Sequence, residues 1–209
     1  MINIQVFCLA SVGVLVMGCA VSALPEFVTK PEPPVEWNVQ IETKAGCPNV
    51  TGKYVSIPKV ADLQQDGLWR VSNGNWYDHL LLIPFNRATA VESTPNQTLP
   101  EYSRNSLLIE LNEQEGTLRI VSPDKNNENF ATHIFSKAAR DYTCQAGNLV
   151  FPEFKIQGGT EGSFLNGKTY RQATITSSGD LLLYEQTQSH KAFHKYYLFK
   201  SKESQGTAG

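Results

Sequence analysis

Residues 169–187, TYRQATITSSGDLLLYEQT, decide the fold class of this chain, because they describe one β-hairpin almost completely. Apolar and polar residues alternate on both sides of a short polar turn, and alternation with a period of two is typical of strands. Gly179 supplies the positive φ that closes a tight hairpin. The stretch predicts two antiparallel strands, Thr169–Ser177 and Leu181–Thr187.

The same hairpin signature recurs earlier in the chain. Gly116 and Gly147 each open a strand after a short polar turn, and Gly67 is a looser fourth instance. The spacing of the three closest matches, 31 and 32 residues, permits an internal repeat. Similar hairpin closures in one meander explain the likeness more simply.

Period-two patterns run along the rest of the body, and no window shows a 3.6-residue period over three turns. Only Ser136–Arg140 is expected to make one helical turn. We therefore predict an all-β fold, an antiparallel meander that forms a single barrel-like or two-layer domain. The further predicted strands are Gly52–Ile57, Gly67–Val71, Asp78–Phe85, Ser106–Leu111, Thr117–Ser122, Phe130–Ser136, Asp141–Cys144, Asn148–Phe154 and Phe193–Lys200.

Composition excludes several classes of protein. The 209 residues are 41% hydrophobic and 18% charged, with a formal net charge of −2, which rules out a disordered chain, a coiled coil and a multi-span membrane protein. Residues 20–44 hold four acidic and two basic residues, so 45–209 hold 20 − 4 = 16 acidic and 18 − 2 = 16 basic residues. A neutral body predicts no nucleic-acid partner.

The N-terminal stretch has the pattern of an export signal. No charged residue lies between Val6 and Leu24, and an apolar run ends in Leu15-Val16-Met17-Gly18-Cys19. This ending resembles the lipobox of bacterial lipoproteins. The resemblance implies that residues 1–18 are a signal peptide and that Cys19 is acylated, which anchors the protein in the membrane. Because Ala20, and not Asp, follows, it also implies the outer membrane, with the body facing the periplasm.

Two other interpretations of this stretch remain open. Ordinary signal cleavage could occur after Ala23, or the uncharged residues could stay in the bilayer as one short helix. Gly13, Gly18 and Pro25 argue against that helix. In all three cases the body of the protein is exported.

The cysteines fit an oxidising compartment. Cys8 leaves with the signal and Cys19 carries the lipid, so Cys47 and Cys144 remain as a pair for which a disulfide is expected. The loop between them spans 144 − 47 = 97 residues, and closing a loop of that length stabilises the fold by about 4–5 kcal/mol on chain-entropy grounds. The alternative is two free buried thiols. We expect no metal site here, since no CxxC pattern or nearby histidine pair supports either cysteine.

The chain divides into four parts. Residues 19–44, rich in proline, are predicted to be an extended tether that could reach about 70 Å from the bilayer. Residues 45–200 form the β domain, and 201–209 a disordered tail. Within the tether Trp37, Val39 and Ile41 alternate, so its end could lie down as an edge strand.

The start of the domain carries two short resemblances. Gly52-Lys53-Tyr54 resembles the opening of lipocalin-type barrels. Cys47-Pro48 with Gly52 and Tyr54 resembles the Cys-Pro-x-x-x-Gly-x-Tyr opening of small proteobacterial lipoproteins of uncharacterised function. In that second family a later Cys-x-x-Gly-x-Leu, here beginning at Cys144, and a final aromatic strand also occur. The likeness implies a compartment and an architecture, and no activity.

Catalytic signatures are missing from the sequence. There is no GxSxG, HExxH, GxGxxG, P-loop or EF-hand pattern, so we expect no catalytic residues, no cofactor and no metal, with a hydrolase as the less favoured alternative. His190 and His194 would lie on one face of a strand, which permits a metal pair, although surface histidines are the simpler interpretation. Glu110, Glu113 and Glu115 fall at a hairpin where solvated charge is the default.

Aromatic residues gather in two places, and two interpretations of them lead to two functions. As core they define no ligand site, and the lipobox, the tether, the cysteine pair and the missing catalytic signatures then favour a non-enzymatic binding or envelope-assembly module, whose partner could be an envelope protein. As a cavity lining they indicate a lipocalin-like carrier of small apolar ligands. We favour the first. The two groups are Trp69, Trp76, Tyr77 and Phe85, and Tyr184, Phe193, Tyr196, Tyr197 and Phe199.

Overall fold

Two antiparallel sheets build the protein. The computed structural model describes residues 30–41, 45–75, 90–95, 106–123, 129–158, 165–188 and 192–202. Among these residues there is no α-helix, and the only helical element is the short 3-10 turn η1 (Val35–Trp37). The strands are β1 (Gly52–Val55), β2 (Lys59–Leu63), β3 (Trp69–Asn73), β4 (Ala90–Pro95), β5 (Ser106–Asn112), β6 (Thr117–Pro123), β7 (Asn129–Ser136), β8 (Thr143–Gln145), β9 (Asn148–Gly158), β10 (Leu165–Ile175), β11 (Leu181–Gln188) and β12 (Ala192–Phe199).

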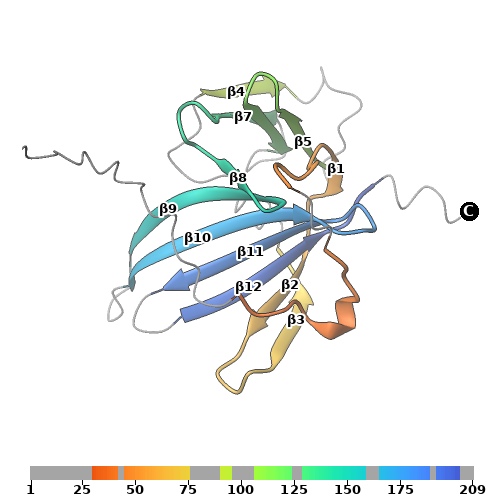
Figure 1. The fold of residues 1–209 in the computed structure, drawn as a ribbon, viewed down its shortest axis with the longest axis vertical. Helices are drawn as coiled ribbons and strands as arrows, with labels where there is room; N and C mark the ends of the chain where they lie inside the picture. Colours follow the sequence, from red (N-terminus) through yellow and green to blue (C-terminus); the bar gives the residue numbers. More distant parts are fainter. Residues whose placement is uncertain are drawn as a thin grey trace, which may run out of the picture.

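The all-β prediction is confirmed, in a two-layer form that is not a closed barrel. A five-stranded sheet has the order β1-β5-β6-β7-β4, and a seven-stranded sheet has the order β3-β2-β12-β11-β10-β9-β8. Figure 1 shows the smaller sheet lying over one part of the larger sheet, while β9 to β12 extend beyond it.

The predicted strands largely coincide with the observed ones, with three differences. β2 and β4 were not predicted, and Lys137–Arg140 forms a turn where one helical turn was expected. The predicted strand Asp78–Phe85 lies outside the described residues. β2 is short and contains Asp62, and a charged residue in phase with the apolar side of a five-residue strand hides the alternation from which strands are recognised.

The hairpin glycines have the backbone conformation that their positions require. Gly116, Gly147 and Gly179 have φ values of 65°, 74° and 78°, and Gly67 has 80°. These values lie in the left-handed region, where a side chain is strained. The expected hairpin closures are confirmed at all four glycines.

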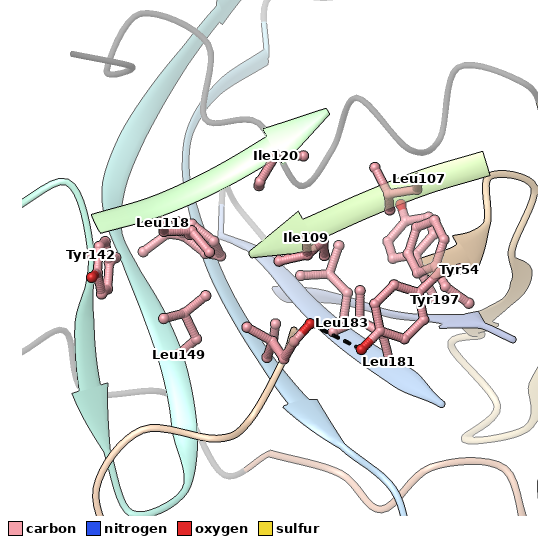
Figure 2. Packing of buried hydrophobic residues seen from close by; sticks show 14 of the residues in the cluster. Tyr54, Leu107, Ile109, Leu118, Ile120, Tyr142, Leu149, Leu181, Leu183 and Tyr197 are labelled. Carbon is pink, nitrogen blue, oxygen red and sulfur yellow. Dashed lines mark hydrogen bonds between the residues drawn. The ribbon is translucent and has the colours of Figure 1, made fainter. Parts of the chain in front are cut away.

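The core lies between the two sheets. Leu107 and Leu118 of the smaller sheet and Leu181 and Leu183 of β11 are all fully buried, and they pack in one cluster. Figure 2 shows these leucines converging from both layers, with Tyr54 and Tyr197 beside them. Large aromatic residues complete the same cluster, so bulky side chains occupy the space between the layers.

A disulfide and a strand extension tie the two layers together. The disulfide Cys47–Cys144 is present, with a Cα–Cα distance of 4.7 Å, and it joins the segment before β1 to β8. Beyond β12, Ser201 forms a β-bridge with Tyr54 of β1, and Lys202 N donates a hydrogen bond to the carbonyl of Lys53. The first two residues of the predicted tail are therefore paired with the smaller sheet.

Candidate functional site: a charged row and a strapped aromatic face

Five charged residues stand in one row across the seven-stranded sheet. The strand register pairs Arg171 of β10 with Glu185 of β11, Glu185 with Lys195 of β12, Lys195 with Asp62 of β2, and Asp62 with Arg70 of β3. The charges alternate in sign from one strand to the next. We call these five residues the charged row.

The charged row lies on the inner face of the sheet. Two residues along each strand, Ala173, Leu183, Tyr197 and Val60 form the adjacent row, and all four belong to the core between the layers. Side chains two residues apart on a strand point to the same face. The charged row therefore lies next to the core on the same face of the sheet, where polar side chains replace apolar ones.

The pair at one end of the row is deeply buried. Arg171 Nε donates to Glu185 Oε2 across 2.6 Å, with side-chain exposures of 5% and 11%. The guanidinium carbon lies 4.5 Å from the ring centroid of Phe154, which covers it on one side. Arg171 Nη1 is also buried, and it has no hydrogen-bond partner. A buried ion pair adds little net stability because desolvation offsets its attraction.

The three residues of the row beyond that pair are more exposed. Lys195 Nζ lies 2.9 Å from Asp62 Oδ1, and their side chains are 42% and 31% exposed. Arg70, on the edge strand β3, is exposed. The row thus leads from solvent at β3 to a buried guanidinium at β10.

A third row lies beyond the charges. Thr169 Oγ1 and Thr187 Oγ1 are 3.1 Å apart, and Thr187 pairs across the strands with Phe193 of β12. Thr169 is completely buried, whereas Phe193 is 45% exposed. Hydroxyl groups therefore adjoin the buried end of the charged row, and an aromatic ring adjoins Lys195 in its middle.

The opposite face of the same sheet is covered by the N-terminal segment. Residues 30–41, which we call the strap, run across it and include η1, as Figure 1 shows in orange. Trp37, Val39 and Ile41 pack against the outer apolar cluster. Ser177 N donates to the carbonyl of Gln40, and Ile41 forms a single bridge with Thr176. The expected alternation is therefore present, although it makes one bridge and no strand.

Aromatic rings lie under the strap. The ring centroids of Tyr184 and Tyr196 are 5.0 Å apart, and Trp69 lies 5.4 Å from Tyr196. The Tyr196 hydroxyl donates to the carbonyl of Pro31 across 2.6 Å. Lys30 Nζ lies over both tyrosine rings, 5.3 Å and 5.8 Å from their centroids.

Burial shifts the pKa values of Lys30, Tyr184 and Tyr196 in this cluster. It lowers the pKa of Lys30 to about 8, against a smaller raising effect of Glu32. Burial also raises the pKa of Tyr184 and of Tyr196, the latter with smaller contributions from Tyr184 and Glu32. Desolvation disfavours the charged form of each group, which explains the opposite directions.

His194 belongs to the outer face as well. Its Nδ1 lies 2.7 Å from the hydroxyl of Tyr184, and the two rings stack with centroids 6.1 Å apart. Burial lowers the pKa of His194. Its predicted companion His190 lies outside the described residues.

The other predicted site residues are distributed over the molecule. Glu110 pairs with Arg119 on the smaller sheet, with Nη1 and Oε2 2.6 Å apart, whereas Glu113 and Glu115 are exposed in the following turn. Tyr197 and Phe199 are core residues. Cys19, Trp76, Tyr77 and Phe85 lie outside the described residues.

Metal-binding clusters and membrane-spanning helices are both absent from the described ranges. No group of three or more His, Cys, Asp or Glu side chains there could hold a metal ion. No helix formed by those residues is long and apolar enough to cross a membrane.

The charged row was not predicted, although the sequence contains a signal for it. Arg171 stands in phase with Ala173 and Ile175, and Glu185 stands in phase with Leu181 and Leu183, so both charges fall on the apolar side of their strands. Opposite charges in phase with a buried face, on two strands of one hairpin, indicate a buried ion pair.

Comparison with known proteins adds no relative: no protein family, curated protein or solved structure matches this chain.

Proposed function

We propose that this protein is a lipid-anchored, non-enzymatic β domain of the outer membrane that faces the periplasm and serves as a binding or envelope-assembly module. The observation that carries the proposal is the strap. Of the chain that follows the predicted anchor, residues 30–41 are packed on the sheet.

The strap shortens the distance over which an anchored body could move. Only residues 20–29 separate Cys19 from Lys30. At 3.1 Å per extended residue these ten residues reach about 31 Å. A tether ending at residue 44 would reach about 70 Å. The proposed anchor therefore holds the domain close to the bilayer.

Two further features support the proposal. A disulfide that closes a 97-residue separation suits an oxidising compartment such as the periplasm. Large side chains, among them Tyr54, Phe135 and Phe151, occupy the space between the described layers, which favours a binding module over a carrier that encloses an apolar ligand.

The test is detergent partitioning of the expressed protein. Cys19→Ser should move the protein from the detergent phase to the aqueous phase, because the two or three acyl chains of a lipoprotein bury many methylenes at about 0.8 kcal/mol each. Cys8→Ser is the matched control, since Cys8 belongs to the segment that is removed. If Cys19→Ser partitions like the unchanged protein, the proposed anchor is wrong.

A further inference from the structure

Arg171 has hydrogen-bonding capacity that the fold does not use. A guanidinium carries five N–H donors in a fixed planar fork, which matches the oxygens of carboxylate and phosphate groups. The bond to Glu185 employs Nε, while Nη1 is buried without a partner. A buried donor left without an acceptor destabilises the fold, so such atoms are rare unless something binds there.

We propose that Arg171 is the centre of a binding site for a small oxyanion, a carboxylate or a phosphate group, on the inner face of the seven-stranded sheet. The site is independent of the lipid anchor, because it uses residues of the opposite face from the strap. An oxygen of the ligand accepts a hydrogen bond from Arg171 Nη1.

The neighbouring threonines supply a second donor. In the pair Thr169–Thr187 one hydroxyl hydrogen lies between the two oxygens, and the second hydroxyl has its own hydrogen outside that bond. Thr169 and Arg171 are two residues apart on one strand and face the same side of the sheet. A guanidinium edge and a hydroxyl side by side are the donors that an oxyanion requires.

The local charge also favours an anion. The charged row holds three basic and two acidic residues, 3 − 2 = +1, in a body whose total formal charge is zero. Glu185 already lies between Arg171 and Lys195 along the row. An added monoanion would bring the row to neutrality, so its burial is compensated by charges that are already in place.

The exposed residues of the charged row provide a route by which an anion can reach Arg171 from solvent. Arg70 is exposed, Lys195 is 42% exposed and Arg171 is 5% exposed. An anion that approaches from β3 therefore passes Arg70 and Lys195, which alternate with Asp62 and Glu185, before it reaches the buried guanidinium. A purely structural ion pair has no need of this graded arrangement.

The decisive measurement follows the arginine Nε–Hε signals in an NMR titration of the full chain in detergent. The chain has six arginines, so the spectrum is simple. Sodium phosphate and sodium acetate are the two probes, with ionic strength kept constant by sodium chloride. The Arg171 signal should shift and saturate with at least one probe, and that probe identifies phosphate or carboxylate as the preferred group. If the signal responds to neither probe, or equally to sodium chloride alone, the proposal is overturned.

Variants separate binding from a structural role. Because they lack the Arg171 signal, their binding is followed through the backbone amide signals of Thr169 and Thr187, next to position 171 on the same face. Arg171→Lys keeps a positive charge beside Glu185 but removes the fork, and it should weaken binding of the active probe by roughly tenfold or more, the loss expected for a charged hydrogen bond. Arg171→Met with Glu185→Met replaces the pair by apolar side chains of similar size and should also lose binding. Retained binding in both variants would place the ligand elsewhere.

The smaller sheet offers a matched control. Arg119 and Glu110 form a second Arg–Glu pair between neighbouring strands at the same 2.6 Å, but their side chains are 38% and 46% exposed. Arg119→Met with Glu110→Met should leave probe binding unchanged. Detergent partitioning reports only on the anchor and the titration reports only on Arg171, so failure of one proposal is distinguishable from failure of the other.

Discussion

The hydroxyl of Tyr184 lies 2.7 Å from Nδ1 of His194, on the sheet face that the strap covers. The two residues stand on neighbouring strands, where Tyr184 pairs with Tyr196 and His194 pairs with Gln186. Because burial lowers the pKa of His194, the imidazole stays neutral and its nitrogen can accept the phenolic hydrogen. This contact links the titration of a histidine to the face on which the strap is packed.

Acidification should therefore destabilise the protein through His194. A histidine whose folded pKa lies below its ordinary 6.5 binds fewer protons in the folded state, so its contribution to stability is complete above pH 6.5 and is lost as pH falls through the folded pKa. The melting temperature should fall between pH 7 and pH 5, and His194→Gln should reduce that fall. An unchanged pH dependence in His194→Gln would contradict the assignment.

Alkaline pH should tighten the strap through Lys30. Its pKa is lowered from 10.5 to about 8 by burial, so the packed state binds fewer protons, and packing gains stability as pH rises from 8 towards 10.5. Hydrogen exchange of the strap, corrected for the intrinsic rate, should slow between pH 8 and 9.5, below the ordinary pKa of 10 of the facing tyrosines. Lys30→Met should abolish this trend. Glu32 also faces Lys30, and its negative charge raises the pKa of Lys30 against the larger effect of burial.

Packing of the strap should depend on Trp37 and not on Val35. Trp37 packs against the outer cluster, whereas Val35, two residues earlier, is 92% exposed. Trp37→Ala should lower the free energy of opening of the strap by about 2–3 kcal/mol, the loss expected for a large, partly buried apolar side chain. Val35→Ala should change it by less than about 0.5 kcal/mol. Exchange at the Ser177 amide, which donates to the carbonyl of Gln40, measures both variants. Equal effects would show that Trp37 does not hold the strap.

Reduction of the disulfide should weaken the whole fold. The bond Cys47–Cys144 closes a 97-residue separation, and opening it should lower the free energy of unfolding by about 4–5 kcal/mol on chain-entropy grounds. Denaturant unfolding of the protein with Cys47→Ser and Cys144→Ser measures this loss. A midpoint equal to that of the oxidised protein would mean that the bond constrains little of the unfolded chain.

Much of the architecture could be predicted because its signals are local. The hairpin of β10 and β11 follows from alternation and from one glycine, both of which act within a few residues. β2 escaped prediction because Asp62 interrupts the apolar phase, and the reason for that aspartate is Lys195, far away in the chain. The candidate site was harder still, since the charged row takes residues from five strands.

From the sequence alone, period-two patterning determined the all-β class, the turn glycines determined the hairpins, and the count of cysteines determined the disulfide, because each depends on neighbouring residues or on composition. Only the tertiary structure decided that Arg171 keeps a spare donor beside its ion pair and that the strap lies on the sheet. The Tyr196 hydroxyl meets the carbonyl of Pro31 across 165 residues of chain, and strand register brings Arg70 and Arg171 into one row. Burial and partnership between residues so far apart are properties of the folded chain, and no local pattern encodes them.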